Sequence, residues 1–175
     1  MGTTVLRSRS SRAIGAVTMG VAAVALGSAV IDGLDVLMTY GAPVVAFGVL
    51  GWAGFWHPYV EVSDGGVTVV NTLRTVQVPW PAIEGVEGRY GLKLRTAYGP
   101  VTAWAAGAPS GRARARSEES EAAHLVREHL ASLQAAGHLD NPRLEKPALE
   151  TSWHRELLAG LGALLIATVV LPLLA

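Results

Sequence analysis

Three long apolar stretches and one segment of alternating residues divide this chain. The apolar stretches cover residues 13–31, 36–56 and 157–175, and none of them contains a charged residue. A helix needs about 20 apolar residues to cross roughly 30 Å of hydrocarbon. The pattern therefore predicts a transmembrane helical hairpin over residues 13–56, closed by a short loop, and a C-terminal transmembrane helix over 156–175.

Residues 57–106 show a different pattern, in which apolar and polar residues alternate between turn signals. Val60 and Val62 alternate with polar neighbours, and Asp64-Gly65-Gly66 then provides a hairpin turn. Alternation with a turn every 8–12 residues is typical of an antiparallel sheet with one buried face. The predicted core consists of Val62, Val69, Val78, Trp80, Ile83, Leu92 and Leu94.

One further helix is predicted at residues 117–136. Ser117 can cap it, and Ala122, Val126 and Leu130 share one face. The remaining segments lack a period: a basic tail (1–12), a linker (107–116) and a tether (137–155). The predicted fold class is an α+β membrane protein with three transmembrane helices, a small antiparallel β module and a following helix.

The distribution of arginine predicts the orientation. Arg7, Arg9 and Arg12 precede the first apolar stretch, whereas the hairpin loop carries Asp32 and Asp35. Basic residues favour the cytoplasmic side. We therefore expect a plasma-membrane protein with its N-terminus and β module in the cytoplasm and its C-terminus outside. Cleavage of residues 1–31 as a signal peptide is the alternative, although this apolar run exceeds the usual 7–15 residues.

Composition narrows the function classes. Only 16% of residues are charged and the net charge is zero, so nothing argues for nucleic acid as a partner. The chain has no cysteine, and His124 and His129 are spaced poorly for one metal on a helix. Phosphate-binding and nucleophile motifs are absent from the sequence. We therefore expect no enzymatic activity, no metal and no cofactor.

Small residues recur at helical spacing in the apolar stretches. They are Ala16, Gly20, Ala23 and Gly27 in the first and Gly48 and Gly51 in the second. Such stripes let helix backbones approach closely. The sequence predicts that they pack the two helices of the hairpin together. A contact with another chain, or simply an alanine- and glycine-rich composition, would produce the same pattern.

Basic residues form the second candidate feature. Arg89, Lys93 and Arg95 have one parity, and Arg112, Arg114 and Arg116 alternate in the linker. They are candidates for contact with a partner or with anionic lipid, at about 1 kcal/mol per residue near a membrane surface. A solvated strand face and a soluble linker explain them equally well.

Three short motifs resemble the bacterial PH-like domains of small membrane proteins, including the low-molecular-weight protein antigen type. They are Val-Ser-Asp-Gly-Gly-Val-Thr-Val at 62–69, Asn-x-x-Arg at 71–74 and Val-Pro-Trp-x-x-Ile at 78–83. The resemblance implies a PH-like fold in a membrane setting, with Trp80 and Ile83 in the core and no catalytic residues to carry over.

The sequence thus predicts a non-enzymatic integral membrane protein. Its cytoplasmic PH-like module would bind a protein partner, with anionic lipid as a further ligand, and its apolar helices would sit in the lipid bilayer. The alternative function is a small accessory subunit of a larger membrane complex, in which the transmembrane helices make the functional contacts.

Overall fold

The computed structural model describes residues 3–89, 91–104, 120–137 and 147–174. The chain forms two compact units. The sheet unit contains Met1–Ser8 and Pro58–Trp153, and the helical unit contains Arg9–His57 and His154–Ala175. Each unit is therefore built from segments that lie far apart in the sequence, and the chain passes between the two units three times.

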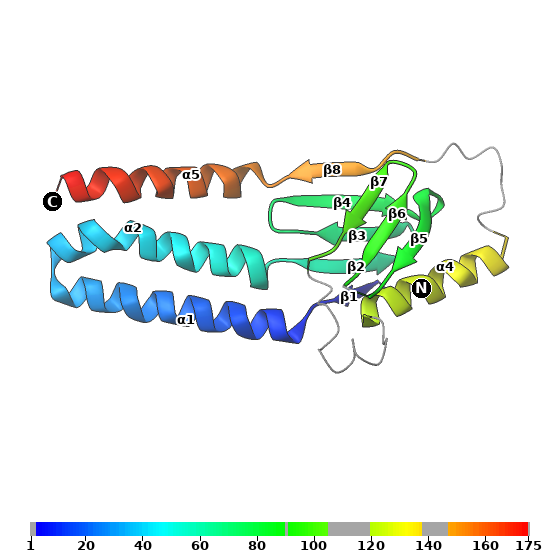
Figure 1. Ribbon diagram of the computed structural model, residues 1–175, viewed down its shortest axis with the longest axis horizontal. Coiled ribbons are helices and arrows are strands. Elements are labelled where there is room, and N and C mark those ends of the chain that lie inside the picture. The colour runs from blue at the N-terminus through cyan, green and yellow to red at the C-terminus, as the bar shows by residue number, and fades with distance from the viewer. Residues whose placement is uncertain (1–2, 90, 105–119, 138–146, 175) are drawn as a thin grey trace. The chain divides into compact units, whose positions relative to one another are not determined.

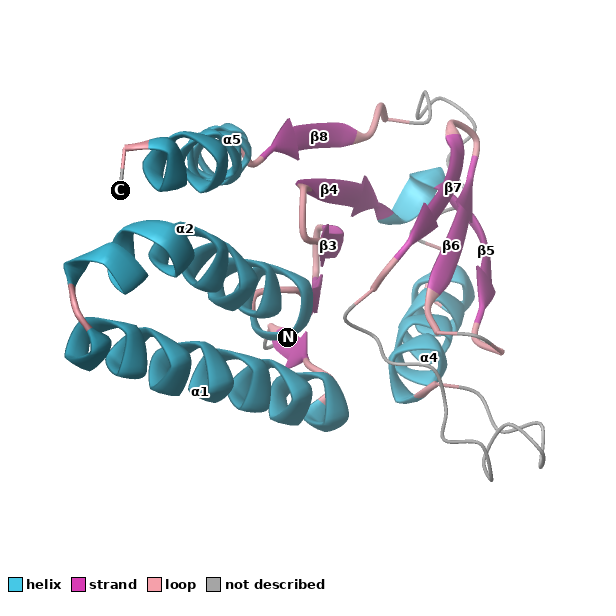
Figure 2. Ribbon diagram, turned by 60° about the vertical axis from the view of Figure 1, so that its left-hand side comes forward, coloured by secondary structure: helices cyan, strands magenta, loops and turns pink. Residues whose placement is uncertain are grey.

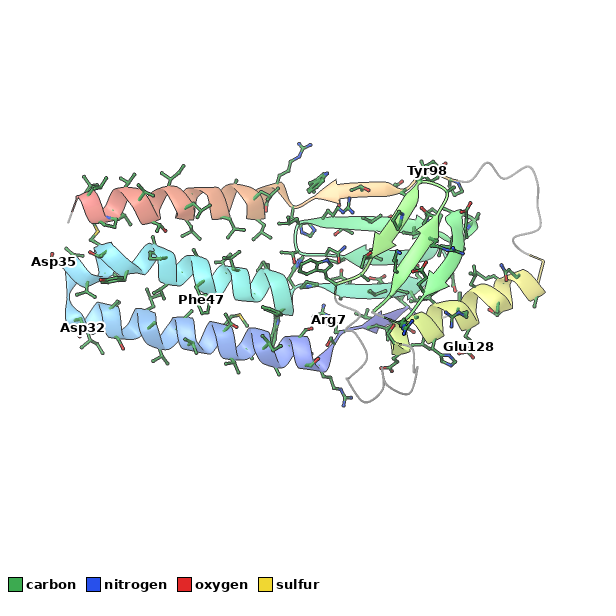
Figure 3. All side chains as sticks on the ribbon, in the orientation of Figure 1. Arg7, Asp32, Asp35, Phe47, Tyr98 and Glu128 are labelled. Atoms are coloured by element: carbon green, nitrogen blue, oxygen red, sulfur yellow. The ribbon has the colours of Figure 1, made fainter. Side chains whose placement is uncertain are left out.

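The helical unit consists of α1 (Arg9–Asp32), α2 (Leu34–Gly51) and α5 (Arg155–Val170). A π-helical turn (Trp52–Trp56) extends α2, and a 3-10 turn (Leu171–Leu173) follows α5. Asp32 and Asp35 lie at the tight turn between α1 and α2 (Figure 3). With these extensions the three helices have 24, 23 and 19 residues and are long and apolar enough to cross a membrane.

The packing face of α1 consists of Gly15, Ala22 and Ala29, which recur every seven residues and are buried. A β-carbon added to Gly48 of α2 would lie 3.1 Å from Cβ of Ala22, and one added to Gly51 would lie 2.5 Å from Cγ2 of Thr18. Gly48 and Gly51 therefore allow α1 and α2 to approach closely.

The small-residue stripe predicted on α1 lies on a different face. Ala16, Gly20, Ala23 and Gly27 are exposed, and no atom lies within 4 Å of a β-carbon added to Gly20 or Gly27. The true contact is displaced by about one residue, which corresponds to roughly 100° around the helix. Because α1 carries small residues on several faces, their spacing did not identify the face that packs on α2.

The first sheet of the sheet unit has five antiparallel strands in the order β1-β2-β3-β4-β8 (Figure 1). Its centre is a meander of β2 (Tyr59–Ser63), β3 (Gly66–Val70) and β4 (Arg74–Pro79). Its edges are β1 (Thr4–Leu6) and β8 (Glu150–Trp153). The edge strands come from the two ends of the chain, one from before α1 and one from just before α5.

These edge strands lie within the segments predicted as a basic tail (1–12) and a tether (137–155). Leu6 pairs with Val60, and Arg74 pairs with Trp153. β1 and β8 have three and four residues, too few to show a convincing alternation. Their strand conformation depends on partners distant in sequence, which a local pattern does not reveal.

The second sheet contains β5 (Ile83–Glu87), β6 (Lys93–Thr96) and β7 (Gly99–Thr102), in that order (Figure 2). A 3-10 turn (Trp80–Ala82) joins the two sheets. β5 follows this turn directly, beginning at the buried Ile83. The register shifts between Ile83 and Gly85, and this irregularity breaks the alternation expected of a strand.

The helix α4 (Glu121–Ala135) completes the core. The Ser120 hydroxyl accepts a hydrogen bond of 3.3 Å from the Ala123 backbone N–H, so Ser120 is the cap; Ser117, the predicted cap, lies outside the described residues. One face of α4 enters the same buried cluster as the strands, through Ala122, Ala123, Val126 and Leu130. All seven residues predicted as the core lie in this cluster: Val62, Val69, Val78, Trp80, Ile83, Leu92 and Leu94.

Candidate interaction surfaces of the sheet unit

The outer face of β6 presents two basic side chains. Lys93 and Arg95 alternate with the buried Leu94 and Thr96, so they project away from the core. Lys93 Nζ lies 3.1 Å from Oε2 of Glu87, and Arg95 Nε lies 3.8 Å from Oε1 of the same carboxylate. Glu87 on the neighbouring strand therefore balances part of their positive charge. Each exposed pair of this kind contributes at most about 1 kcal/mol to stability.

A shallow depression of about 390 Å³ lies over this face. It is lined by Glu84, Lys93, Arg95, Thr96, Gly99 and Pro100. A β-carbon added to Gly85 would lie 3.0 Å from Nη2 of Arg95, so the missing side chain leaves room for the guanidinium to lie across β5. The depression combines both signs of charge and suits a polar, charged ligand group.

The other predicted basic residues are not brought onto this strand. Arg89 is exposed but lies outside β6, in an isolated bridge with Gly91. The predicted single stripe of three basic residues on one strand is therefore reduced to Lys93 and Arg95. Arg112, Arg114 and Arg116 lie outside the described residues.

Two backbone carbonyl groups, one in β5 and one just after it, accept hydrogen bonds from α4 and from the residue that caps α4. The Ser120 backbone N–H donates to Gly88 O at 3.1 Å, and Arg127 Nη2 donates to Val86 O at 2.9 Å. An uncovered strand edge is a template for pairing with another chain. These bonds make β5 a poor site for adding a partner strand. Sequence reasoning did not single out Arg127, because a cation on an exposed helix face carries no sign of such a contact.

One end of the first sheet carries the three connections to the helical unit. This end is a row of paired residues that crosses all five strands. The pairs are Leu6 with Val60, Tyr59 with Val70, Val70 with Thr75, and Arg74 with Trp153. β1 and β8 finish at this row and β2 begins there. We call it the helix-joined end. Residues 7–8 lead from it to α1, residues 57–58 lead to it from the extension of α2, and residue 154 leads to α5.

The helix-joined end also gathers exposed large apolar side chains. Trp104 is 72% exposed, Trp153 54% and Leu73 41%. Asn71 holds two of the contributing segments together: its Nδ2 donates to Thr102 O at 2.9 Å, and its Oδ1 accepts from the Trp104 backbone N–H at 2.9 Å. Asn71 and Leu73 belong to the turn between β3 and β4. The Asn71 backbone N–H donates to Arg74 O at 2.9 Å and so closes this turn.

Two arginines accompany these rings. Arg74 Cζ lies 5.9 Å from the ring centroid of Trp153, and Arg7 Cζ lies 4.9 Å from that of Tyr59. Such distances suit cation–π contact. Arg7 follows β1 directly (Figure 3). Trp153 and Tyr59 are recognisable in the sequence as interfacial aromatics, whereas Leu73 and Trp104 join them only through the Asn71 contacts.

The histidines are distributed over separate places. In the helical unit, the His57 and His154 rings stand edge to face with centroids 5.2 Å apart, although 96 residues separate them in sequence. In the sheet unit, His129 packs on Trp80 with ring centroids 4.8 Å apart. Among the described residues there is no group of three or more metal-ligating side chains.

Two antiparallel sheets around one core, with α4 packed into that core after β7, are the arrangement expected of a PH-like module. Residues 57–138 match the family model described as the bacterial PH domain. The chain therefore contains a bacterial PH-like domain, as its motifs predicted. The match includes α4 but neither β1 nor β8. Comparison with curated proteins gave no match, and comparison with solved structures gave none.

Proposed function

We propose that this protein is a multi-pass membrane protein whose PH-like module binds a protein partner and catalyses no reaction. PH-like domains are generally binding modules without catalytic activity, and three helices of sufficient length and apolarity flank this one. The observation that carries the proposal is the depression on the second sheet. It offers Lys93 and Arg95 beside Glu84 and Glu87, and this mixture suits a polar protein surface.

Anionic lipid is a secondary ligand of this face. A site that attracts headgroups by charge alone needs an excess of basic residues. Here Glu87 lies beside both Lys93 and Arg95, which lowers that excess. A partner protein can instead present its own acidic and basic groups in matching positions, so that electrostatic complementarity provides specificity.

The proposed location is the plasma membrane, with the N-terminus and module in the cytoplasm and the C-terminus outside. The pairing of β1 with β2 supports a hairpin of α1 and α2, because strands of one sheet must lie on the same side of a membrane. It also favours retention of the N-terminal segment over its removal as a signal peptide. The arginines before and within the start of α1 favour the cytoplasmic side.

A second candidate function is an accessory subunit that binds other membrane proteins through its helices. The exposed stripe of α1 favours it, since Gly20 and Gly27 have open space beside them. α5 contributes no buried residue to the described structure. Both surfaces are therefore available to helices of another protein, and small residues would allow close approach.

One experiment separates the two functions. The intact protein would be cross-linked in its native membrane, purified in mild detergent and analysed for stoichiometric partners. The double variant Lys93→Glu/Arg95→Glu tests the module, Gly20→Leu tests the helices, and Glu128→Lys on exposed α4 is the charge-reversal control. Loss of a partner with the double variant alone supports the module. Loss with Gly20→Leu alone supports the subunit function, and retention of every partner in both variants refutes both.

A further inference from the structure

The two ends of the first sheet differ in chemistry. The end opposite the helix-joined end carries the turn Asp64-Gly65-Gly66 and the start of β8 at Glu150, all small or acidic. The helix-joined end carries Leu73, Trp104 and Trp153, which are exposed although large and apolar. Exposed apolar side chains gathered at one place mark an interaction surface.

We propose that the helix-joined end is a lipid-contact surface, with Leu73, Trp104 and Trp153 lying in the headgroup layer of the bilayer. The inference rests on the proposed function in one respect: it requires that α1, α2 and α5 cross that bilayer. It adds that the module itself touches the lipid, through side chains that belong to the sheet unit and not to any helix.

Chain connectivity selects the bilayer as the occupant. Each of the three connections at this end has only one or two residues. Such a connection reaches at most about 10 Å when fully extended. Helices that cross the bilayer would therefore hold this end of the sheet near the membrane surface, and they would do so at three points along the same row of strands. A soluble partner would have to displace lipid from a surface that is already tethered there.

The side-chain chemistry agrees with a headgroup layer. Tryptophan and tyrosine concentrate at membrane–water interfaces, where an apolar ring meets lipid and a polar group stays hydrated. Arg74 beside Trp153 and Arg7 beside Tyr59 place a cation next to such a ring. Arginine can donate to lipid phosphates with two parallel hydrogen bonds. The surface thus pairs groups for the apolar and the anionic parts of a phospholipid.

The test uses single cysteines carrying a small fluorophore, because the chain has no native cysteine. Leu73→Cys and Trp104→Cys report on the proposed surface. Gly65→Cys is the matched control at the opposite end, where an added β-carbon meets open space. Val24→Cys, on an exposed position of α1, reports on helix insertion. Each full-length variant is reconstituted into vesicles of phosphatidylethanolamine and phosphatidylglycerol.

Fluorescence is then measured with a nitroxide-labelled lipid and, separately, with aqueous iodide. We expect loss of fluorescence to the lipid quencher at Leu73 and Trp104, little loss there to iodide, and the reverse at Gly65. Quenching by iodide at Leu73 and Trp104 equal to that at Gly65 would overturn the inference, and so would shielding from both quenchers, which means that protein covers the surface. Failure of the lipid quencher at Val24 would overturn the proposed membrane location, and the inference with it.

Discussion

The assignment of Trp80 to the core can be tested against a matched substitution at an exposed tryptophan of the same chain. The Trp80 side chain is 3% exposed, its ring packs on His129, and its indole N–H donates to Ser63 O at 3.0 Å. Emptying a large core site by Trp→Ala costs about 3–5 kcal/mol in the free energy of unfolding. Trp80→Phe keeps most of the ring but loses the hydrogen bond and some volume, at about 1–2 kcal/mol.

The control is Trp104→Ala, the same chemical change at a side chain that is 72% exposed. Surface substitutions of this kind change stability by about 0.5 kcal/mol or less. The assay is urea unfolding of the full-length protein in mild detergent. At each urea concentration, the folded fraction of the sheet unit is measured as the fraction that resists a short protease pulse. For a slope of about 1.5 kcal/mol/M, Trp80→Ala should lower the midpoint by about 2–3 M. Equal midpoints for Trp80→Ala and Trp104→Ala would refute the assignment of Trp80 to the core.

Three further predictions concern the helices and the ends of elements. Gly48→Leu should lower the melting temperature in detergent, because its side chain collides with α1, whereas Gly20→Leu should leave it unchanged; equal effects would contradict the observed packing face. Ser120→Ala should cost about 1 kcal/mol in the urea assay through loss of the helix cap, and an unchanged midpoint would show that the cap contributes nothing. A membrane-impermeant thiol reagent should label Leu34→Cys in intact cells but Gly65→Cys only after permeabilisation, and the opposite result would invert the proposed topology.

The central part of the fold was readable from the sequence because its signals are local. β2 and β4 alternate in burial, and the turn between β2 and β3 carries glycine where the backbone requires it. Gly66 has a φ of 153°, and a β-carbon there would overlap the Val78 carbonyl oxygen. A local sequence window contains all of this information, and the same holds for the apolar period of α4.

Features that depend on distant partners were not readable in this way. β1 and β8 become strands only because β2 and β4 offer edges to them. The packing face of α1 is selected by α2, since Gly15 and Ala22 are no smaller than Ala16 and Gly20 on the open side. At the candidate sites, Lys93 and Arg95 were found by strand parity. The clamp from Asn71 to Trp104 required the fold itself.

The edge strands also determine when the first sheet can be finished during synthesis. β1 leaves the ribosome first, but its partner β2 follows only after both helices of the hairpin. β8 is made last among the strands, immediately before α5. Chains begin to fold from their N-terminal parts as they emerge. In the nascent meander of β2, β3 and β4, the outer edge of β4 therefore remains unpaired until residues 150–153 appear. A chain that terminates earlier would retain this open edge, which could pair with a strand from a neighbouring molecule.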